Sequence, residues 1–408
     1  MKETLRELEA LAELRRKELA GREKGSRPVI GWSGPYIPEE LIRAAGADTW
    51  PLGRGGGSVP VNPVLRGQLR FMNPLARNLA GYPQSDPGAP ACDLLVIQQT
   101  DCHTARAGEL LAFEGKPVCL TGIPSDWTSP ASFSLYEEAL REMLARVEEI
   151  TGRSVNPDAA GDNFAGTNRI NALFRRLNLF RKTEDPPFGF SDWIRLQHVS
   201  LLVEDSVLTG RLEELCRRLE DRASGWTQSQ NGSETQARCN EEPGQREKNG
   251  RPSAGRRPRI LLAGRAVAPG DYMLTQILEE SGAVIAAQML DEGIRIYEKD
   301  IDTEGDLIRN FAGNRYLDTV PANFMLGSWE RRFDHMMSLI EDRSIDGVVW
   351  YQLSFDELYD MEYAGLAERL SPRGIPLIKL ESSYDDSPVS MGMITTRAES
   401  FVESLRMP

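Results

Sequence analysis

The sequence predicts an α/β protein with two doubly wound parallel-sheet lobes of the Rossmann or flavodoxin type, a helical connector and a disordered linker. Continuous apolar runs such as Leu94–Ile97 are typical of strands buried on both faces of a parallel sheet. Helical stretches alternate with these runs, which is the pattern of βαβ units. A long segment without large apolar residues divides the chain into two such halves.

The chain should begin with a helix over residues 1–27. Four leucines recur every three positions among charged residues and predict one apolar stripe on a charged helix: Leu5, Leu8, Leu11 and Leu14. Such a helix is expected to pack against the body of the protein.

The first lobe should occupy residues 28–160. Its expected strands are Val29–Trp32, Thr49–Leu52, Leu94–Ile97 and Pro117–Thr121. One helix should begin near Pro38, since proline is tolerated in the first turn of a helix, and another should cover about Ala105–Phe113.

Longer amphipathic helices should follow over Tyr136–Ile150, at the end of the first lobe, and over Asn168–Lys182, after it. The stretch Trp193–Leu219 should be largely helical.

The connector should cover residues 161–226 and the linker residues 227–258. The linker contains no Val, Ile, Leu, Met, Phe, Trp or Tyr, so it cannot bury enough apolar area to offset its ordering entropy. We therefore expect it to be disordered and dispensable.

The second lobe should cover residues 259–408 and repeat the α/β pattern. Its expected strands are Arg259–Ala263, Val284–Ala287, Asp346–Trp350 and Pro376–Leu380. Its expected helices are Tyr272–Ser281, Leu358–Leu370 and Thr396–Leu405.

Charge and composition exclude several classes of function. The 408 residues carry 61 acidic and 48 basic side chains, a net charge of −13, which disfavours binding to nucleic acid or to an anionic membrane. No apolar run is long enough to span a bilayer, and the charged first 25 residues lack a signal-peptide core, so a cytoplasmic protein is expected. Five scattered cysteines and three histidines predict neither a disulfide framework nor a zinc site with the usual spacing.

Three segments follow predicted strands, at the sheet edge where open parallel sheets bind ligands. They are Ser33–Tyr36, Gln98–His103 and Tyr351–Glu357. We predict that Ser33, Cys102 and the loop Ser354–Glu357 lie together at the mouth of a cleft between the lobes.

Cys102 opens a predicted helix, whose N-terminus would favour a thiolate and hence metal ligation or nucleophilic chemistry, with His103 as a base. The alternative is that Cys102 is a small buried residue and His103 a surface residue. The glycine-rich stretches 53–58 and 264–270 match neither the P-loop nor the dinucleotide-binding pattern, so the first is expected to be a flexible loop.

Several segments, in this order, resemble one family. They include GWSGPYIPEELI at 31–42, DLLVI at 93–97 with TDC at 100–102, RILLAG at 259–264, DGVV at 346–349, and LESSY at 380–384 with TRAESFVE at 396–403. The chain in this respect resembles the subunits of 2-hydroxyacyl-CoA dehydratases and benzoyl-CoA reductases, and in particular the 2-hydroxyglutaryl-CoA dehydratase D-component. The resemblance covers nearly the whole chain apart from the linker.

The resemblance implies a subunit that pairs with a homologous subunit as a heterodimer. Each subunit of this family typically holds a 4Fe–4S cluster by three cysteines, and an ATP-dependent iron–sulfur activator supplies a low-potential electron. The resemblance also implies an acyl-CoA substrate that passes through a ketyl radical on the way to dehydration or ring reduction. Their positions after predicted strands make Ser33, Tyr36 and His103 candidate catalytic residues, and the resemblance makes Cys102 the candidate cluster ligand.

The sequence departs from the family pattern at two cluster positions. The first cysteine is expected near Met72–Arg77 and the third at about Ser354 or Phe355, and neither segment contains one. Cys92 and Cys119 lie at the start of one predicted strand and within the next. Two further hypotheses therefore stand beside the enzyme subunit: a non-catalytic partner or assembly subunit that has lost the cluster, and a doubly wound module that binds a small molecule.

Overall fold

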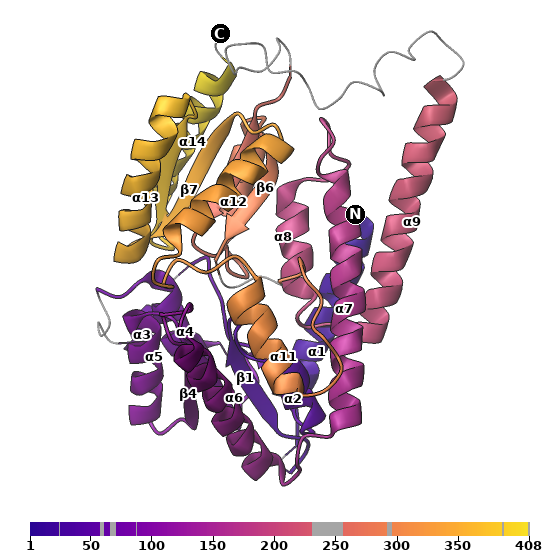
Figure 1. Cartoon of the computed structure of the whole chain (residues 1–408), viewed down its shortest axis with the longest axis vertical. Helices are drawn as coiled ribbons and strands as arrows, with labels where there is room; N and C mark the ends of the chain where they lie inside the picture. The colour runs from indigo at the N-terminus through magenta and orange to yellow at the C-terminus, as the bar shows by residue number, and fades with distance from the viewer. Residues whose placement is uncertain are drawn as a thin grey trace.

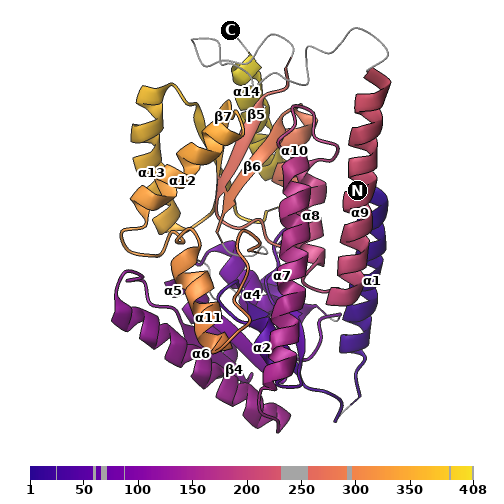
Figure 2. The same cartoon turned by 45° about the vertical axis from the view of Figure 1, so that its right-hand side comes forward.

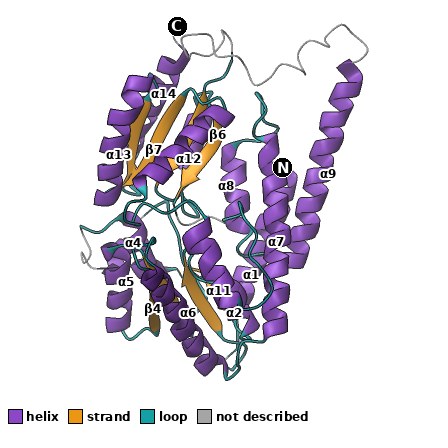
Figure 3. Cartoon of the chain, viewed as in Figure 1, coloured by secondary structure: helices purple, strands orange, loops and turns teal. Residues whose placement is uncertain are grey.

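Two α/β lobes lie end to end in the computed structural model, which describes residues 1–23, 25–57, 61–65, 71–86, 88–230, 256–291, 296–385 and 387–406 (Figure 1). Each lobe has a four-stranded parallel sheet with helices on both faces, which confirms the predicted fold class (Figure 3). Among the described residues, no helix is long and apolar enough to cross a membrane.

The sheet of lobe 1 has the order β2-β1-β3-β4. Its strands are β1 (Val29–Ser33), β2 (Asp48–Pro51), β3 (Leu94–Gln99) and β4 (Val118–Gly122). The apolar side chains of β3 alternate between two cores, as the pleat of a strand requires, and Ile30 and Trp32 of β1 belong to the first of them. One face is covered by α2 (Glu39–Ala44), α6 (Pro130–Thr151) and part of α7 (Pro157–Phe180); the other is covered by α3 (Asn62–Leu65), α4 (Pro74–Ser85) and α5 (Cys102–Phe113).

The sheet of lobe 2 repeats this arrangement in the order β6-β5-β7-β8. Its strands are β5 (Arg259–Gly264), β6 (Val284–Leu290), β7 (Gly347–Leu353) and β8 (Leu377–Ser382). One face packs on α12 (Trp329–Asp342) and α13 (Glu357–Leu370), and the other on α8 (Phe190–Val199), α10 (Met273–Glu280) and α14 (Pro388–Arg406).

The segment between β6 and α12 crosses back to lobe 1. There α11 (Leu307–Gly313) continues into a π-helical turn (Asn314–Asp318), and Phe311 and Tyr316 join the core formed by β1, β3 and α6. Figure 1 shows α11 lying beside α6, on the lower lobe. The two lobes are therefore tied together by packing as well as by the connector.

The connector and the N-terminal helix form one side of the molecule (Figure 2). There α1 (Lys2–Ala20), α7, α8 and α9 (Asp205–Gln230) pack against one another. The predicted leucine stripe of α1 is only partly confirmed, because Leu5 and Leu8 are buried but Leu14 is exposed. A helix turns by about 100° per residue, so nine positions place Leu14 on the side opposite Leu5.

Most of the predicted linker lies outside the described residues, which resume at residue 256. The helix α9 continues to Gln230, so residues 227–230 are helical.

Candidate functional site

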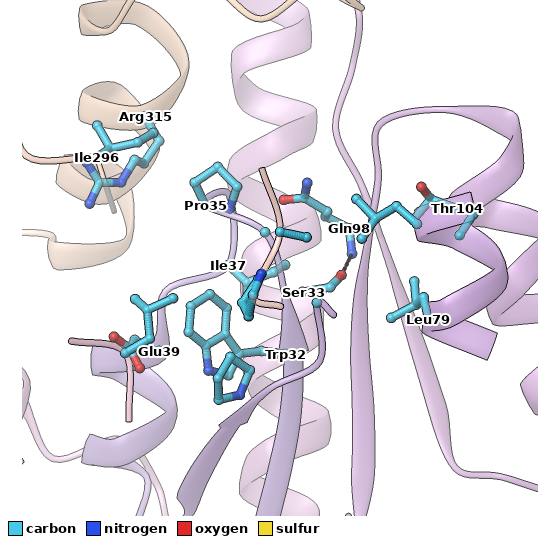
Figure 4. Close-up of a pocket in the computed structure, with 18 of the residues that line it drawn as sticks. Trp32, Ser33, Pro35, Ile37, Glu39, Leu79, Gln98, Thr104, Ile296 and Arg315 are labelled. Carbon is cyan, nitrogen blue, oxygen red and sulfur yellow. Dashed lines mark hydrogen bonds between the residues drawn. The ribbon is translucent and has the colours of Figure 1, made fainter. Parts of the chain in front are cut away.

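The carboxyl ends of both sheets face each other, and a mostly apolar cavity of about 100 Å³ lies between them. Lobe 1 contributes the end of β1 and the turn after it, the start of α2, one face of α4, Gln98 and Thr104. Lobe 2 contributes Arg265 and the loop after it, and the α11 segment, which packs on lobe 1, contributes Phe311 and Arg315. We call this space the interlobe cavity; Figure 4 shows its lining.

Ser33 lies at the end of β1 and faces this cavity (Figure 4). Its Oγ accepts a hydrogen bond from the backbone N–H of Gln98 at 3.2 Å. The next residue, Gly34, has a φ of +75°, and a Cβ there would lie 2.0 Å from the Gln98 amide carbon. The sequence thus places glycine where the backbone turns sharply, and this lets Gln98 pack close to Ser33.

Tyr36 lies in the core of lobe 1 rather than in the lining of the cavity. Its ring packs edge-on against Tyr136 and Phe324, and its carbonyl accepts a hydrogen bond from the Tyr136 hydroxyl at 2.7 Å. Its backbone N–H donates to Gln98 Oε1 at 3.3 Å. The structure therefore gives Tyr36 a role in shaping the turn after β1.

Cys102 and His103 line a second, adjacent space, the Cys102 pocket, at the rim of the interlobe region. Lobe 1 contributes Asn73 and Thr100–His103, while lobe 2 contributes Arg265 and Asn323–Phe324 together with the loop Phe355–Tyr359. The predicted meeting of Cys102 with the loop after β7 is therefore found. Ser33 instead lines the neighbouring interlobe cavity. Arg265 lines both the interlobe cavity and the Cys102 pocket.

Cys102 is the first residue of α5 and is exposed. Partial burial raises the pKa of its thiol, and the nearby carboxylates of Asp101 and Glu357 raise it further. These effects outweigh the opposing backbone hydrogen bonds at the start of the helix. The expectation that the helix N-terminus stabilises a thiolate is therefore wrong in direction, because burial and, to a smaller extent, the nearby carboxylates raise the thiol pKa.

His103 is held by the backbone of the neighbouring helix. Its Nδ1 accepts a hydrogen bond from the N–H of Asn73 at 2.8 Å, and its Nε2 lies 4.0 Å from Glu357 Oε2. This geometry assigns the ring proton to Nε2 in the neutral tautomer. The ring thus links α4, α5 and the start of α13.

Arg265 is the buried cation between the two spaces. Its Nη2 lies 3.2 Å from Asp101 Oδ2, and its Nε lies 3.6 Å from Asp356 Oδ2. Burial would raise the pKa of Asp101, but the charge of Arg265 and hydrogen bonds from Thr104 outweigh burial and lower it. Asp101 is therefore an ionised partner of Arg265 at neutral pH.

The position of Arg265 depends on the glycine before it. Gly264 ends β5 with a φ of +115°, and a Cβ there would lie 2.1 Å from the Tyr351 carbonyl oxygen. The N–H of Arg265 donates to this same oxygen at 2.8 Å. Only glycine allows this approach, which turns the chain so that Arg265 faces lobe 1.

The described thiols do not fit a cluster held by three cysteines. Cys119 pairs with Val96 in the middle of the sheet, about 10 Å below its carboxyl edge at 3.3 Å per residue. Cys92 precedes β3 and lines a different cavity, while Cys216 is buried in α9. Within the described ranges, no group of three or more His, Cys, Asp or Glu residues is placed to hold a metal ion. Cys239 lies outside those ranges.

Arg265 and Asn73 are site residues that the sequence-based prediction does not single out. Arg265 directly follows a predicted strand, and this is the signal that could identify it, although the glycine pattern of 264–270 matches no known binding loop. Asn73 precedes a helix with proline at its first position, which is a typical N-cap arrangement.

Comparison with known proteins agrees with this architecture. The family model of the 2-hydroxyglutaryl-CoA dehydratase D-component matches residues 35–405. The chain belongs to this family. The match confirms the resemblance found in the sequence and extends across both lobes.

Two relatives of this family member align over nearly their full length. A protein of Escherichia coli (strain K12) named as dehydratase subunit YjiM is 24% identical over 386 residues, covering 93% of this chain and 91% of that protein. One of the benzoyl-CoA reductase subunits of Thauera aromatica is 22% identical over 396 residues, covering 94% and 92%. The structure of FpvC from Pseudomonas aeruginosa aligns at 11% identity and covers 93% of this chain and 99% of that chain. Its TM-score of 0.20 is too low to indicate a shared fold.

Proposed function

We propose that this chain is the acyl-CoA-binding subunit of a dehydratase or reductase complex and that it does not itself hold the iron–sulfur cluster. The family match supports a subunit of such a complex. The observation that carries the proposal is the interlobe cavity, which is apolar, lies at the carboxyl ends of both sheets and is built by both lobes.

The lining of the cavity suits a small acyl group attached to a thioester. Trp32, Leu75, Leu79 and Phe311 supply apolar contacts, while Ser33 supplies a polar one at the sheet edge. Because Ser33 Oγ already accepts from Gln98, its O–H is the group with which it can donate to a bound ligand. Ser33 would thus orient a carbonyl oxygen in the cavity.

In this proposal, other subunits of the complex carry out the redox chemistry. A homologous subunit with its full set of cluster cysteines would form a heterodimer with this chain, and the ATP-dependent activator would deliver its electron there. In this chain Cys102 and His103 would line the route between the two subunits, and Tyr36 would shape the turn that holds Ser33.

Binding of acyl-CoA tests the proposal directly. Isothermal titration of the full chain with butyryl-CoA, benzoyl-CoA and free CoA should show that the acyl forms bind at least about tenfold more tightly than free CoA, because each buried methylene contributes about 0.8 kcal/mol. Leu75→Trp fills the cavity from α4 and should abolish this preference. Leu135→Trp, on the exposed surface of α6, is the matched control and should retain it.

The other family hypothesis, a non-catalytic assembly subunit, is favoured by the poor fit of the described thiols to a cluster. It predicts equal, weak binding of acyl-CoA and free CoA, unaffected by Leu75→Trp. The same titration therefore separates the two functions, and co-purification with a cysteine-complete homologue would be expected for both.

A further inference from the structure

We infer that a buried ion-pair network centred on Arg265 joins the two lobes at the position where the family would hold its cluster, and that it excludes a cluster from this chain. The inference does not depend on acyl-CoA binding. It concerns the three segments that the family resemblance assigns to cluster cysteines, and the side chains that fill the space between them.

The three segments do converge in the structure. Asn73 stands in the segment of the first position, Cys102 at the second and Phe355 at the third, and these residues line the Cys102 pocket together with Asp356, which follows Phe355 in the chain. Asn73 Nδ2 donates to Asp356 Oδ1 at 2.9 Å, and the Asn73 N–H donates to His103 at 2.8 Å. The segment of the first position is thus hydrogen-bonded to the residue that directly follows the third position, and neither of the two side chains is a thiol.

The centre of this arrangement is filled by the guanidinium of Arg265. It contacts Asp101 Oδ2 at 3.2 Å, Asp356 Oδ2 at 3.6 Å and the Tyr359 hydroxyl at 3.4 Å, and it lies over the Tyr359 ring. Arg265, Asn73 and Asp356 are each buried. A cluster could enter only if Arg265 left, and this would remove the buried guanidinium that contacts the carboxylates of Asp101 and Asp356.

The network is anchored on both sides. In lobe 1, Asp101 caps α5 by accepting from the Thr104 N–H at 2.7 Å, and Asn73 caps α4 by accepting from the Ala76 N–H at 2.8 Å. In lobe 2, the Tyr359 hydroxyl donates to Asp291 at 3.1 Å, and Asp291 is itself paired with the buried Arg332 at 2.8 Å. Asp101 and Asn73 are therefore held by lobe 1, and Tyr359, which contacts Arg265, is held by lobe 2.

Two contacts of the network cross between the lobes: the Asp101–Arg265 ion pair and the Asn73–Asp356 hydrogen bond. Asp101 and Asn73 belong to the first turns of lobe 1 helices, whereas Arg265 follows β5 and Asp356 precedes α13 in lobe 2. Loss of the Asp101–Arg265 bridge should therefore loosen lobe 2 elements near the cleft, which a purely local capping role for Asp101 would not do.

The first measurement tests cluster exclusion. The full chain is treated anaerobically with ferrous iron and sulfide and then desalted, in parallel with Cys102→Ser. We expect equal background iron and no cluster absorbance in both proteins. Stoichiometric iron in the wild type that Cys102→Ser loses would overturn the exclusion.

The second measurement tests whether the Asp101–Arg265 ion pair holds the two lobes together, by hydrogen exchange of Asp101→Asn. Asparagine is also a good N-cap, so this change removes the charge and keeps the Thr104 contact. We expect protection of the first turn of α13, across the cleft, to fall about tenfold. Asp306→Asn, which caps α11 and pairs with Arg141 on the surface, is the matched control and should leave α13 unchanged. Unchanged protection of α13 in Asp101→Asn would contradict the inference that the ion pair joins the two lobes.

Discussion

Asn73 and Asp356 are separated by 283 positions in the chain, yet Asn73 Nδ2 donates a hydrogen bond to Asp356 Oδ1 at 2.9 Å in a buried contact. One residue begins a helix of lobe 1 and the other precedes a helix of lobe 2. The contact depends on the carboxyl edges of the two sheets facing each other, and it shows how closely the lobes approach.

Substitutions of Asn73 should lower the stability of the protein by amounts that depend on the charge placed next to the Asp356 carboxylate. Asn73→Ser keeps a capping oxygen for the Ala76 N–H but loses the donor to Asp356, which should cost about 1–3 kcal/mol of unfolding free energy. Asn73→Asp should cost more, because it places a second buried carboxylate against Asp356. Urea unfolding measures both. An Asn73→Asp protein as stable as Asn73→Ser would contradict the buried contact.

Gly264 should tolerate no side chain. Gly264→Ala places a Cβ against the Tyr351 carbonyl oxygen at a positive φ, so we expect a loss of at least about 2 kcal/mol in unfolding free energy. Gly210→Ala is the matched control, since it lies in the exposed part of α9 with open space around it and should stabilise by about 0.5–1 kcal/mol. Similar effects of the two changes in urea unfolding would refute the strain at Gly264.

Cys102 should be accessible but slow to react. Because its pKa is raised by partial burial and by the carboxylates of Asp101 and Glu357, its alkylation by iodoacetamide at pH 7.5 should be slower than that of a cysteine peptide. Glu357→Gln should speed the reaction less than about threefold, since exposed charges are screened. Mass spectrometry of the labelled peptide gives the rate. Reaction faster than the free peptide would mean that the helix N-terminus dominates.

His198 should make the fold sensitive to acid. Burial lowers the pKa of His198 to about 3, and its Nδ1 lies 2.9 Å from the Tyr272 hydroxyl. Between about pH 6.5 and 3 the unfolded chain binds a proton that the folded chain does not, so stability is lost as the pH falls, by about 1.4 kcal/mol per unit.

The variant His198→Phe isolates this effect. Its unfolding free energy should change less between pH 7 and pH 5 than that of the wild type, by about 2 kcal/mol. Other groups titrate equally in both proteins and cancel in the comparison. An identical pH dependence in urea unfolding of the two proteins would show that His198 is not the group responsible.

Much of the fold could be predicted because central parallel strands are buried on both faces. Such strands need an apolar residue at nearly every position, and Leu94–Ile97 and Gly347–Trp350 show this directly. The helix α4 (Pro74–Ser85) is not predicted, since it contains a proline at position 83 and is buried over much of its surface. Its buried residues include Asn78 and Gly81, which a search for apolar residues does not reveal.

The candidate site could be predicted only in part. The strand-end rule placed Ser33 and Cys102 at one edge of the first sheet, and the loop after β7 was expected near them because the two lobes were predicted to face each other across a cleft. The direction of the Cys102 pKa shift could not be derived, since it depends mainly on burial, which the tertiary structure decides, and in part on Glu357, which is far away in the chain.

The sequence by itself determined the strands, the two α/β halves and the family, because local apolar patterns and short motifs carry that information. Only the tertiary structure decided that Asn73, Asp101, Arg265 and Asp356 meet. Each of these residues reads alone as a helix cap or a surface charge. Their buried contacts depend on how the two lobes face each other, and that orientation is set by the packing of α11 and the connector helices across the whole chain.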